Sequence, residues 1–261
     1  MSNRIKELMD SGREDLLTIY FTAGFPSLGD TRSILKSLQD SGADMVEIGL
    51  PYSDPVADGS TIQKSNMKAL DNGMSISLLF EQLEGMRDEI NIPVILMGYF
   101  NPVLQYGVDA FCKKCESLGI DGLIVPDLPP EVYEKQYRID FESANLLNIF
   151  MITPQTRDER IRLIDKNQNG FIYMVSSASI TGEKKEISES QTDYFNRIKG
   201  MGLNHPVLIG FGISNHDQYK TATSYARGAI IGSAFINALE AAPDDPAGTA
   251  RIFVESIKKK S

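Results

Sequence analysis

Two carboxylates, Glu47 and Asp58, stand on either side of a short segment that contains two prolines. Glu47 lies near the end of an apolar run, and Asp58 comes at the far end of the segment. Pro51 and Pro55 fix their own φ angles and turn the preceding residues away from helical geometry, so the segment is predicted to be a rigid loop. Such a loop can hold Asp58 at a set distance from Glu47. General acid/base chemistry needs this arrangement, and the pair is our first candidate for a catalytic site.

Each acid also has a structural interpretation when it is taken alone. Asp58 fits the N-cap of a helix that begins at Gly59, and a lone acid at the end of a strand can equally be a satisfied structural group. Alternation along a strand places Met45 and Glu47 on the same face, so the Glu47 carboxyl is expected to enter an apolar interior rather than solvent. Desolvation there would raise the pKa of Glu47, which suits a group that exchanges protons near neutral pH.

The chain around these acids alternates short apolar runs with amphipathic stretches, which is typical of repeated βα units and a parallel sheet. Eight runs are predicted as strands: residues 17–23, 44–49, 93–99, 122–125, 148–152, 170–175, 206–210 and 228–232. Eight strands close a barrel of about this chain length, so the predicted fold is α/β: a single (β/α)8 TIM barrel with extra helices, one domain over residues 1–261. The structural alternative is an open doubly wound sheet, which would normally show a glycine-rich turn after its first strand.

Function in such a barrel lies at the carboxyl ends of the strands. Glycines gather after the last two predicted strands, where Gly210 and Gly212 surround one aromatic residue and Gly232 precedes Ser233. Barrels commonly hold a phosphate at this place, on backbone N–H groups and a helix N-terminus. One glycine alone would be an ordinary turn, but two such turns on adjacent strands predict a phosphate site.

Composition excludes several classes of partner. The net charge of -9 and the pI near 4.9 argue against nucleic acid, whose binders usually carry a basic face. No apolar run approaches the ~18 residues of a membrane span, and the N-terminus lacks the apolar core of a signal peptide, so a cytoplasmic protein is expected. Cys112 and Cys115 form a Cys-x-x-Cys pair inside a helical pattern, with no second pair at zinc spacing. They are predicted to be structural thiols, and no metal site is expected.

Five separated segments resemble the tryptophan synthase alpha subunit family, and the resemblance covers essentially the whole chain. The stretch from Glu47 to Gly59, followed by Ile62 and Gln63, is similar to the signature of that family. The other segments are Gly98-Tyr99-Phe100-Asn101-Pro102, Asp127-Leu128-Pro129, Ile180-Thr181-Gly182 and Gly210-Phe211-Gly212-Ile213-Ser214. One departure lies at Ser176–Ser179, where many relatives have an Arg and a Gly.

The resemblance implies a carbon–carbon lyase that cleaves indole-3-glycerol phosphate to indole and glyceraldehyde 3-phosphate. In that family's pattern Glu47 matches the acid/base residue, Asp58 the partner of the indole N–H, and Tyr173 an aromatic residue close to Glu47. This chemistry needs no metal and no cofactor in this chain. The residues expected to form a flat apolar slot for the indole are Tyr20, Met97, Tyr99, Met151 and Phe211. Those expected to hold the phosphate are Gly182, Gly212, Gly232 and Ser233.

The resemblance also implies a partner, the tryptophan synthase beta subunit, in an α2β2 assembly, with pyridoxal phosphate bound by the beta subunit. Contacts with it are expected from Pro51, Ser53 and Asp54 in the loop between the two acids. The polar segment from Ser179 to Gln191 is expected to act as a mobile lid.

Two other functions stay open at this point. One is another phosphate-binding barrel enzyme of aromatic amino-acid metabolism, which would use a catalytic lysine or a different acid pair; no lysine closely follows any of the eight runs. The other is a barrel that has lost its chemistry and serves as an activating subunit, against which the presence of both Glu47 and Asp58 speaks.

Overall fold

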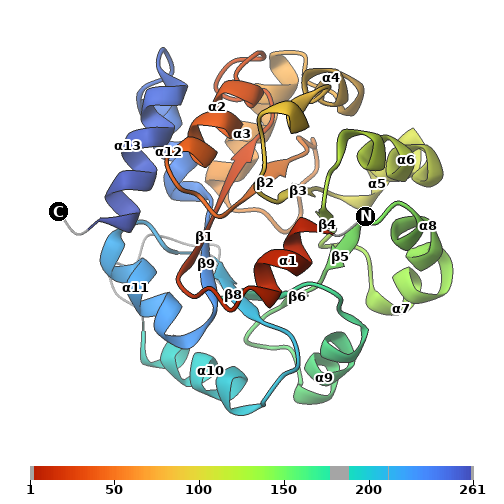
Figure 1. Ribbon diagram of the computed structural model, residues 1–261, viewed down its shortest axis with the longest axis vertical. Helices are drawn as coiled ribbons and strands as arrows, with labels where there is room; N and C mark the ends of the chain where they lie inside the picture. The colour runs from red at the N-terminus through yellow and green to blue at the C-terminus, as the bar shows by residue number, and fades with distance from the viewer. Residues whose placement is uncertain (1–2, 177–187, 211, 260–261) are drawn as a thin grey trace.

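The structure, a computed structural model, describes residues 3–176, 188–210 and 212–259. A ring of parallel strands is enclosed by helices (Figure 1). The strands follow the order β5-β4-β3-β2-β1-β9-β8-β7-β6. Their bounds are β1 Leu16–Thr22, β2 Met45–Gly49, β3 Val94–Met97, β4 Gly122–Ile124, β5 Leu147–Ile149, β6 Met151–Ile152, β7 Ile172–Val175, β8 Val207–Gly210 and β9 Gly228–Ile231.

The fifth predicted strand is interrupted, and this makes nine strands out of eight βα units. β5 ends at Ile149 and β6 begins at Met151, so only Phe150 separates the two strands that stand at opposite ends of the strand order. The carbonyl of Phe150 accepts a hydrogen bond from the backbone N–H of Tyr173 at 3.0 Å. The backbone hydrogen bonds to β7 therefore begin at Phe150 and continue along β6, while β5 pairs with β4. The continuous chain from β5 to β6 joins the two ends of the strand order and closes the sheet. The predicted TIM barrel is confirmed.

Helices surround the barrel on its outside (Figure 1), and they form in the stretches between the apolar runs. Their bounds are α1 Arg4–Asp10, α2 Thr31–Asp40, α3 Ser60–Asp71, α4 Ile76–Gln82, η1 Met86–Asp88, α5 Phe100–Tyr106, α6 Val108–Leu118, α7 Pro130–Val132, η2 (a π-helix) Tyr133–Tyr137, α8 Arg138–Ser143, α9 Asp158–Asn167, α10 Glu189–Gly200, α11 His216–Tyr225, α12 Ser233–Ala241 and α13 Pro246–Lys258. Cys112 and Cys115 are buried, unpaired thiols on α6. Among the described residues, every helix is too short or too polar to cross a bilayer.

The helix α1 closes the amino end of the barrel. Ile5, Leu8 and Met9 on this helix are buried in the same apolar cluster as Met45, on β2, and Phe171, the residue before β7. Asn3, the N-cap of α1, donates from its side chain to the carbonyls of residues 121 and 145, each at 2.8 Å and each just before a strand. The first helix is thus attached to the ends where strands begin, opposite the end expected to carry function.

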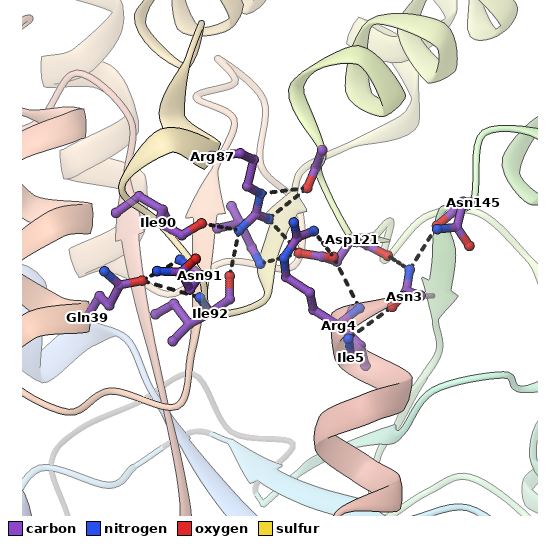
Figure 2. A network of polar contacts seen from close by, with 12 residues as sticks. Asn3, Arg4, Ile5, Gln39, Arg87, Ile90, Asn91, Ile92, Asp121 and Asn145 are labelled. Carbon is purple, nitrogen blue, oxygen red and sulfur yellow. Dashed lines mark hydrogen bonds and ion pairs between the residues drawn. The ribbon is translucent and has the colours of Figure 1, made fainter. Parts of the chain in front are cut away.

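An ion-pair network reinforces this amino end (Figure 2). Asp121, the residue before β4, is buried and accepts from the Arg87 guanidinium at 2.6 Å, the Arg4 guanidinium at 3.1 Å and the backbone N–H of Val94 at 2.9 Å. The Arg87 guanidinium also donates to the carbonyls of Gly119, Ile90 and Ile92. The network therefore joins α1, η1 and the starts of β3 and β4.

Most of the segment predicted to be a lid, residues 179–187, lies outside the described residues. Its last part is a helix start rather than a loop. Ser188 caps α10 in a capping box, in which its hydroxyl accepts from the backbone N–H of Gln191 and the Gln191 side chain accepts from the backbone N–H of Ser188. The predicted boundary at Gln191 was therefore wrong.

Candidate active site

Glu47 is a fully buried carboxyl in the middle of β2. Met45 belongs to the apolar cluster inside the barrel, so alternation along the strand turns Glu47 to the same interior, as predicted. Neither Glu47 oxygen has a hydrogen-bond partner among the described residues. Because burial penalises the charged form, the pKa of Glu47 is raised to about 8. At neutral pH this carboxyl is mainly protonated and is a proton donor.

Two tyrosines, one from the neighbouring strand β1 and one from β7 further round the barrel, interact with Glu47. Tyr20 pairs with Glu47 across β1 and β2, and Tyr173 comes from β7. The Tyr20 hydroxyl occupies the space that a Cβ atom would take at Gly49 on β2, and the Tyr173 hydroxyl does the same at Gly210 on β8. Both positions therefore need glycine. Burial raises the pKa of both phenols, and the negative charges of the site add to the effect. Both hydroxyls therefore stay protonated at neutral pH.

Asp58 reaches the site from the loop after β2. It does not cap α3, as its sequence position alone suggested: Gly59 is the N-cap, and the Asp58 carboxylate instead lies 3.4 Å from the side-chain nitrogen of Asn66 on that helix. The Tyr99 hydroxyl accepts the backbone N–H of Ala57 at 2.8 Å and so fixes the residue before Asp58. Burial raises the pKa of Asp58 to about 6, against the opposing effect of Asn66 and Tyr99. Near pH 7 this carboxyl is mainly ionised.

A small pocket opens beside these groups. Tyr20, Met97, Tyr99 and Asp58 line it, so three of the residues predicted for the indole slot and one predicted catalytic acid meet there. Its other lining residues, which were not predicted as site residues, are Leu50, Asn66, Gly98 and Pro126. For Asn66 a signal existed, because it falls on the same helical face as the buried Ala69 and yet is polar.

The other predicted site residues comprise one indole-slot residue, three phosphate-site residues and two residues that the structure does not describe. Met151 begins β6, packs against the apolar interior and pairs with Tyr173, but it is not among the residues that line the pocket. Gly212, after β8, has a φ of +76°, a conformation that favours glycine. Gly232 is the N-cap of α12 and Ser233 its first residue, so both adjoin the end of β9. Phe211 and Gly182 lie outside the described residues.

The loop predicted to contact a partner lies on the surface at this end of the barrel. Ser53 and Asp54 are exposed, and the Ser53 hydroxyl donates to the Asp54 carboxylate at 2.5 Å. Pro51 is partly exposed, and the Val56 side chain, an apolar group, is 82% exposed.

The two acids differ in protonation state near pH 7. Glu47 is held neutral by apolar burial, whereas Asp58 is held mainly ionised at the pocket wall. Two carboxyls whose surroundings separate their pKa values can act as proton donor and electrostatic stabiliser in one reaction. Within the described part of the chain, no cluster of three or more His, Cys, Asp or Glu side chains comes together as a metal site.

Comparison with known proteins supplies the family. The family model described as "Tryptophan synthase alpha chain" matches residues 5–260. The chain is 53% identical over 256 residues to the tryptophan synthase alpha chain of Flavobacterium johnsoniae, covering 98% of this chain and 100% of that one. This chain belongs to the tryptophan synthase alpha chain family. The resemblance seen in the sequence is thereby confirmed.

Solved structures of tryptophan synthase agree with the fold. The alpha chain from Legionella pneumophila superposes with a TM-score of 0.88 at 30% identity, over 99% of this chain and 97% of that one. A tryptophan synthase complex from Pyrococcus furiosus gives 0.86 at 31% identity, over 94% and 98%. Tryptophan synthase alpha chains are lyases that cleave indole-3-glycerol phosphate in tryptophan biosynthesis, so the predicted activity is confirmed at the level of the family.

Proposed function

We propose that Glu47 and Asp58 perform the cleavage of indole-3-glycerol phosphate in this chain. In this proposal the Tyr173 side chain excludes water from the Glu47 carboxyl. The observation that supports this most is the burial of Glu47 without a hydrogen-bond partner among the described residues. A carboxyl that served only structure would be paired, because an unpaired buried polar group costs about 1–3 kcal/mol. Glu47 instead retains its proton for transfer.

The reaction then follows from the two protonation states. Glu47 donates its proton to the indole carbon that bears the glycerol phosphate side chain, and the ring nitrogen becomes positively charged. The Asp58 carboxylate accepts a hydrogen bond from the indole N–H and stabilises that charge. Glu47, now ionised, removes the proton from the hydroxyl next to the bond. That carbon–carbon bond breaks, its electron pair returns to the ring, and Glu47 regains its proton.

The substrate is proposed to lie between the pocket and the ends of β8 and β9. Tyr20, Met97, Tyr99, Met151 and Phe211 would line the indole slot, and their flat or flexible apolar surfaces suit an aromatic ring. The phosphate would be held at Gly182, Gly212, Gly232 and Ser233, where α12 offers free N–H groups at its N-terminus.

A partner completes the proposed function. The chain would bind a beta subunit in an α2β2 assembly in the cytoplasm, through the exposed loop with Pro51, Ser53 and Asp54. Pyridoxal phosphate would belong to that subunit, and this chain, a single domain over residues 1–261, would act without a cofactor. The chemistry supports this division, since proton transfer by two carboxyls is enough for the cleavage.

An indole-release assay tests the catalytic roles. Glu47→Gln keeps the shape and removes the transferable proton, so kcat is expected to fall about 10³-fold or more. Asp58→Asn removes the stabilising charge and is expected to lower kcat about 10²-fold. Asp40→Asn, at an exposed acid near the end of α2, is the matched control and should behave as the wild type. Substantial indole release by Glu47→Gln would rule out this mechanism, and none by the wild type would favour a non-catalytic activating subunit.

The partner loop needs a separate assay. Asp54→Asn is expected to leave indole release by the isolated chain unchanged and to weaken its stimulation by an added beta subunit, because the exposed carboxylate is available for pairing across an interface. Titrating the beta subunit against both proteins measures the effect. Equal stimulation at every concentration would remove Asp54 from the interface.

A further inference from the structure

Asn66 is a buried amide that the proposed reaction does not yet use. It lies on the second turn of α3, is 2% exposed, and is one of the residues that line the pocket. Its side-chain nitrogen faces the Asp58 carboxylate at 3.4 Å, while its side-chain oxygen is buried with no partner in the described part of the chain. A buried amide with an unpaired oxygen is costly, so a helix built only for packing would hold an apolar residue here.

The orientation of the amide is fixed by chemistry. An ionised carboxylate only accepts hydrogen bonds, so Asn66 must present its NH₂ group to Asp58 and turn its carbonyl oxygen elsewhere. The contact occupies Oδ2 of Asp58. The other carboxylate oxygen, Oδ1, is thereby left for a donor in the pocket.

The backbone on either side of Asp58 is held as well. The Tyr99 hydroxyl accepts the N–H of Ala57 at 2.8 Å, and the side chain of Gln63 donates to the Asp58 carbonyl at 2.9 Å. Because these two contacts fix the main chain, the carboxylate can still move only by rotation about the side-chain bonds of Asp58. The side chains that limit this rotation are Asn66, on Oδ2, and the Tyr99 hydroxyl.

We propose that Asn66 is a positioning residue for Asp58: its amide nitrogen holds one carboxylate oxygen and so aims the other at the indole N–H. This inference rests on the role proposed for Asp58. The inference gives α3 a part in the site. Ser65, the residue before Asn66 on this helix, likewise contacts a barrel strand, through a hydrogen bond with the Thr22 hydroxyl at 2.7 Å.

The electrical surroundings of Asp58 support the same role. Tyr20, Tyr99 and Tyr173 interact electrostatically with it, and Glu47 lies among them as a neutral carboxyl near pH 7. None of these groups carries a positive charge. The hydrogen bond from Asn66 is the first of the contacts that lower the pKa of Asp58 against burial. Without it the carboxylate should protonate at a higher pH.

Carbon NMR titration of isotope-labelled aspartate carboxyls in the unliganded full chain gives a test that does not depend on activity. Asp58→Asn identifies the Asp58 signal. In Asn66→Ala we expect the midpoint of the Asp58 titration to rise by roughly 0.5 to 1 unit, the equivalent of one ordinary hydrogen bond. Asn66→Ser keeps a small donor and should lie between Asn66→Ala and the wild type.

Asn148→Ala is the matched control. Asn148 is 5% exposed, its side-chain oxygen also lacks a partner among the described residues, and it lies between Leu147 and Ile149, which point into the barrel. It therefore points away from the site. Its loss removes a buried amide without touching Asp58, so the Asp58 midpoint should match the wild type, while circular dichroism checks that each variant is folded.

Indole release as a function of pH links the contact to catalysis. If the Asp58 pKa rises by about one unit, its ionised fraction falls about fivefold at pH 6 and hardly at pH 8. The loss of kcat/KM in Asn66→Ala should therefore be about fivefold larger at pH 6 than at pH 8.

The outcomes separate the two proposals. An Asp58 midpoint in folded Asn66→Ala equal to that of the wild type, or an equal shift in Asn148→Ala, overturns the role of Asn66 whatever the activity. A shifted midpoint in Asn66→Ala alone supports it, even if the wild type released no indole and the proposed function failed. An equal loss of kcat/KM at both pH values, with no shift in the midpoint, also overturns it.

Discussion

At the amino end of the barrel, buried carboxylates are surrounded by donors and cations, whereas at the carboxyl end they are surrounded by tyrosines and apolar groups. Asp44 accepts from the backbone N–H of Leu17 and from Lys258, each at 2.9 Å, and pairs with Arg13; Asp121 contacts two arginines. Glu47, at the other end, has no partner among the described residues. One barrel thus contains the same functional group in two opposite environments.

The pKa values follow this division. Burial would raise the pKa of Asp165 near the amino end, but hydrogen bonds from Asn204 and His205 outweigh burial and lower it. Nothing offsets burial at Glu47, and its pKa rises. The paired acids attach strand starts to helices, whereas Glu47, unpaired among the described residues, keeps its proton near neutral pH. Stability and chemistry are therefore separated along the barrel axis, which is the usual division in this fold.

The largest stability effect is expected from Asp121→Ala. The change leaves the Arg87 guanidinium partly buried without its carboxylate and unties α1 from β4. Breaking a buried ion pair in this way typically costs about 3–5 kcal/mol of unfolding free energy. Urea denaturation measures it. A cost below about 1 kcal/mol would mean that the amino-end network contributes little and that the contrast between the two ends is only geometric.

A smaller effect of opposite sign is expected from Glu47→Gln. In the folded protein the pKa of Glu47 is about 8, above the ordinary value of 4.5 that applies to a glutamate in the unfolded chain. As pH rises from 4.5 towards 8, the unfolded wild type releases a proton that the folded protein keeps, so the wild type loses stability and the glutamine variant does not. The advantage of Glu47→Gln in unfolding free energy should grow by roughly 3 kcal/mol between pH 5 and pH 8. Urea denaturation at both pH values would show it, and a constant difference would contradict the raised pKa.

The smallest effect is expected from Asp40→Ala. Its carboxylate pairs with Lys36 one turn earlier on α2, and both side chains are exposed. Such pairs contribute less than about 0.5 kcal/mol, so the urea midpoint should hardly move. A loss comparable to that of Asp121→Ala would show that pairing alone, without burial, explains the amino-end network.

The alternation of apolar runs was enough to predict the barrel, because burial on both faces makes each strand a continuous apolar segment. The break at Phe150 was not predictable, since its cause is a change of pairing partner between β4 and β7 rather than any local turn signal. The start of α10 was readable in Ser188 and Gln191, which have the spacing of a capping box. It was missed because the surrounding polar residues suggested a loop.

The acids of the site were predictable from their position, but their partners were not. Glu47 was placed correctly by strand alternation with Met45. The N-cap role considered for Asp58 was wrong because the carboxylate turns towards Asn66, eight residues later, which only the packing of the loop on α3 reveals. The Tyr99 hydroxyl likewise binds the loop across chain segments far apart in sequence. Pairwise contacts of this kind are a product of tertiary structure.

Direct titration of Glu47 tests whether apolar burial keeps this carboxyl protonated at neutral pH. Carbon NMR of isotope-labelled glutamate carboxyls, with Glu47→Gln to identify the signal, measures its midpoint in the wild-type chain. We expect a midpoint near 8, because burial raises the pKa of this carboxyl to about that value. A midpoint close to 4.5, the ordinary value for a glutamate, would show that Glu47 is ionised at neutral pH and would contradict its role as the proton donor.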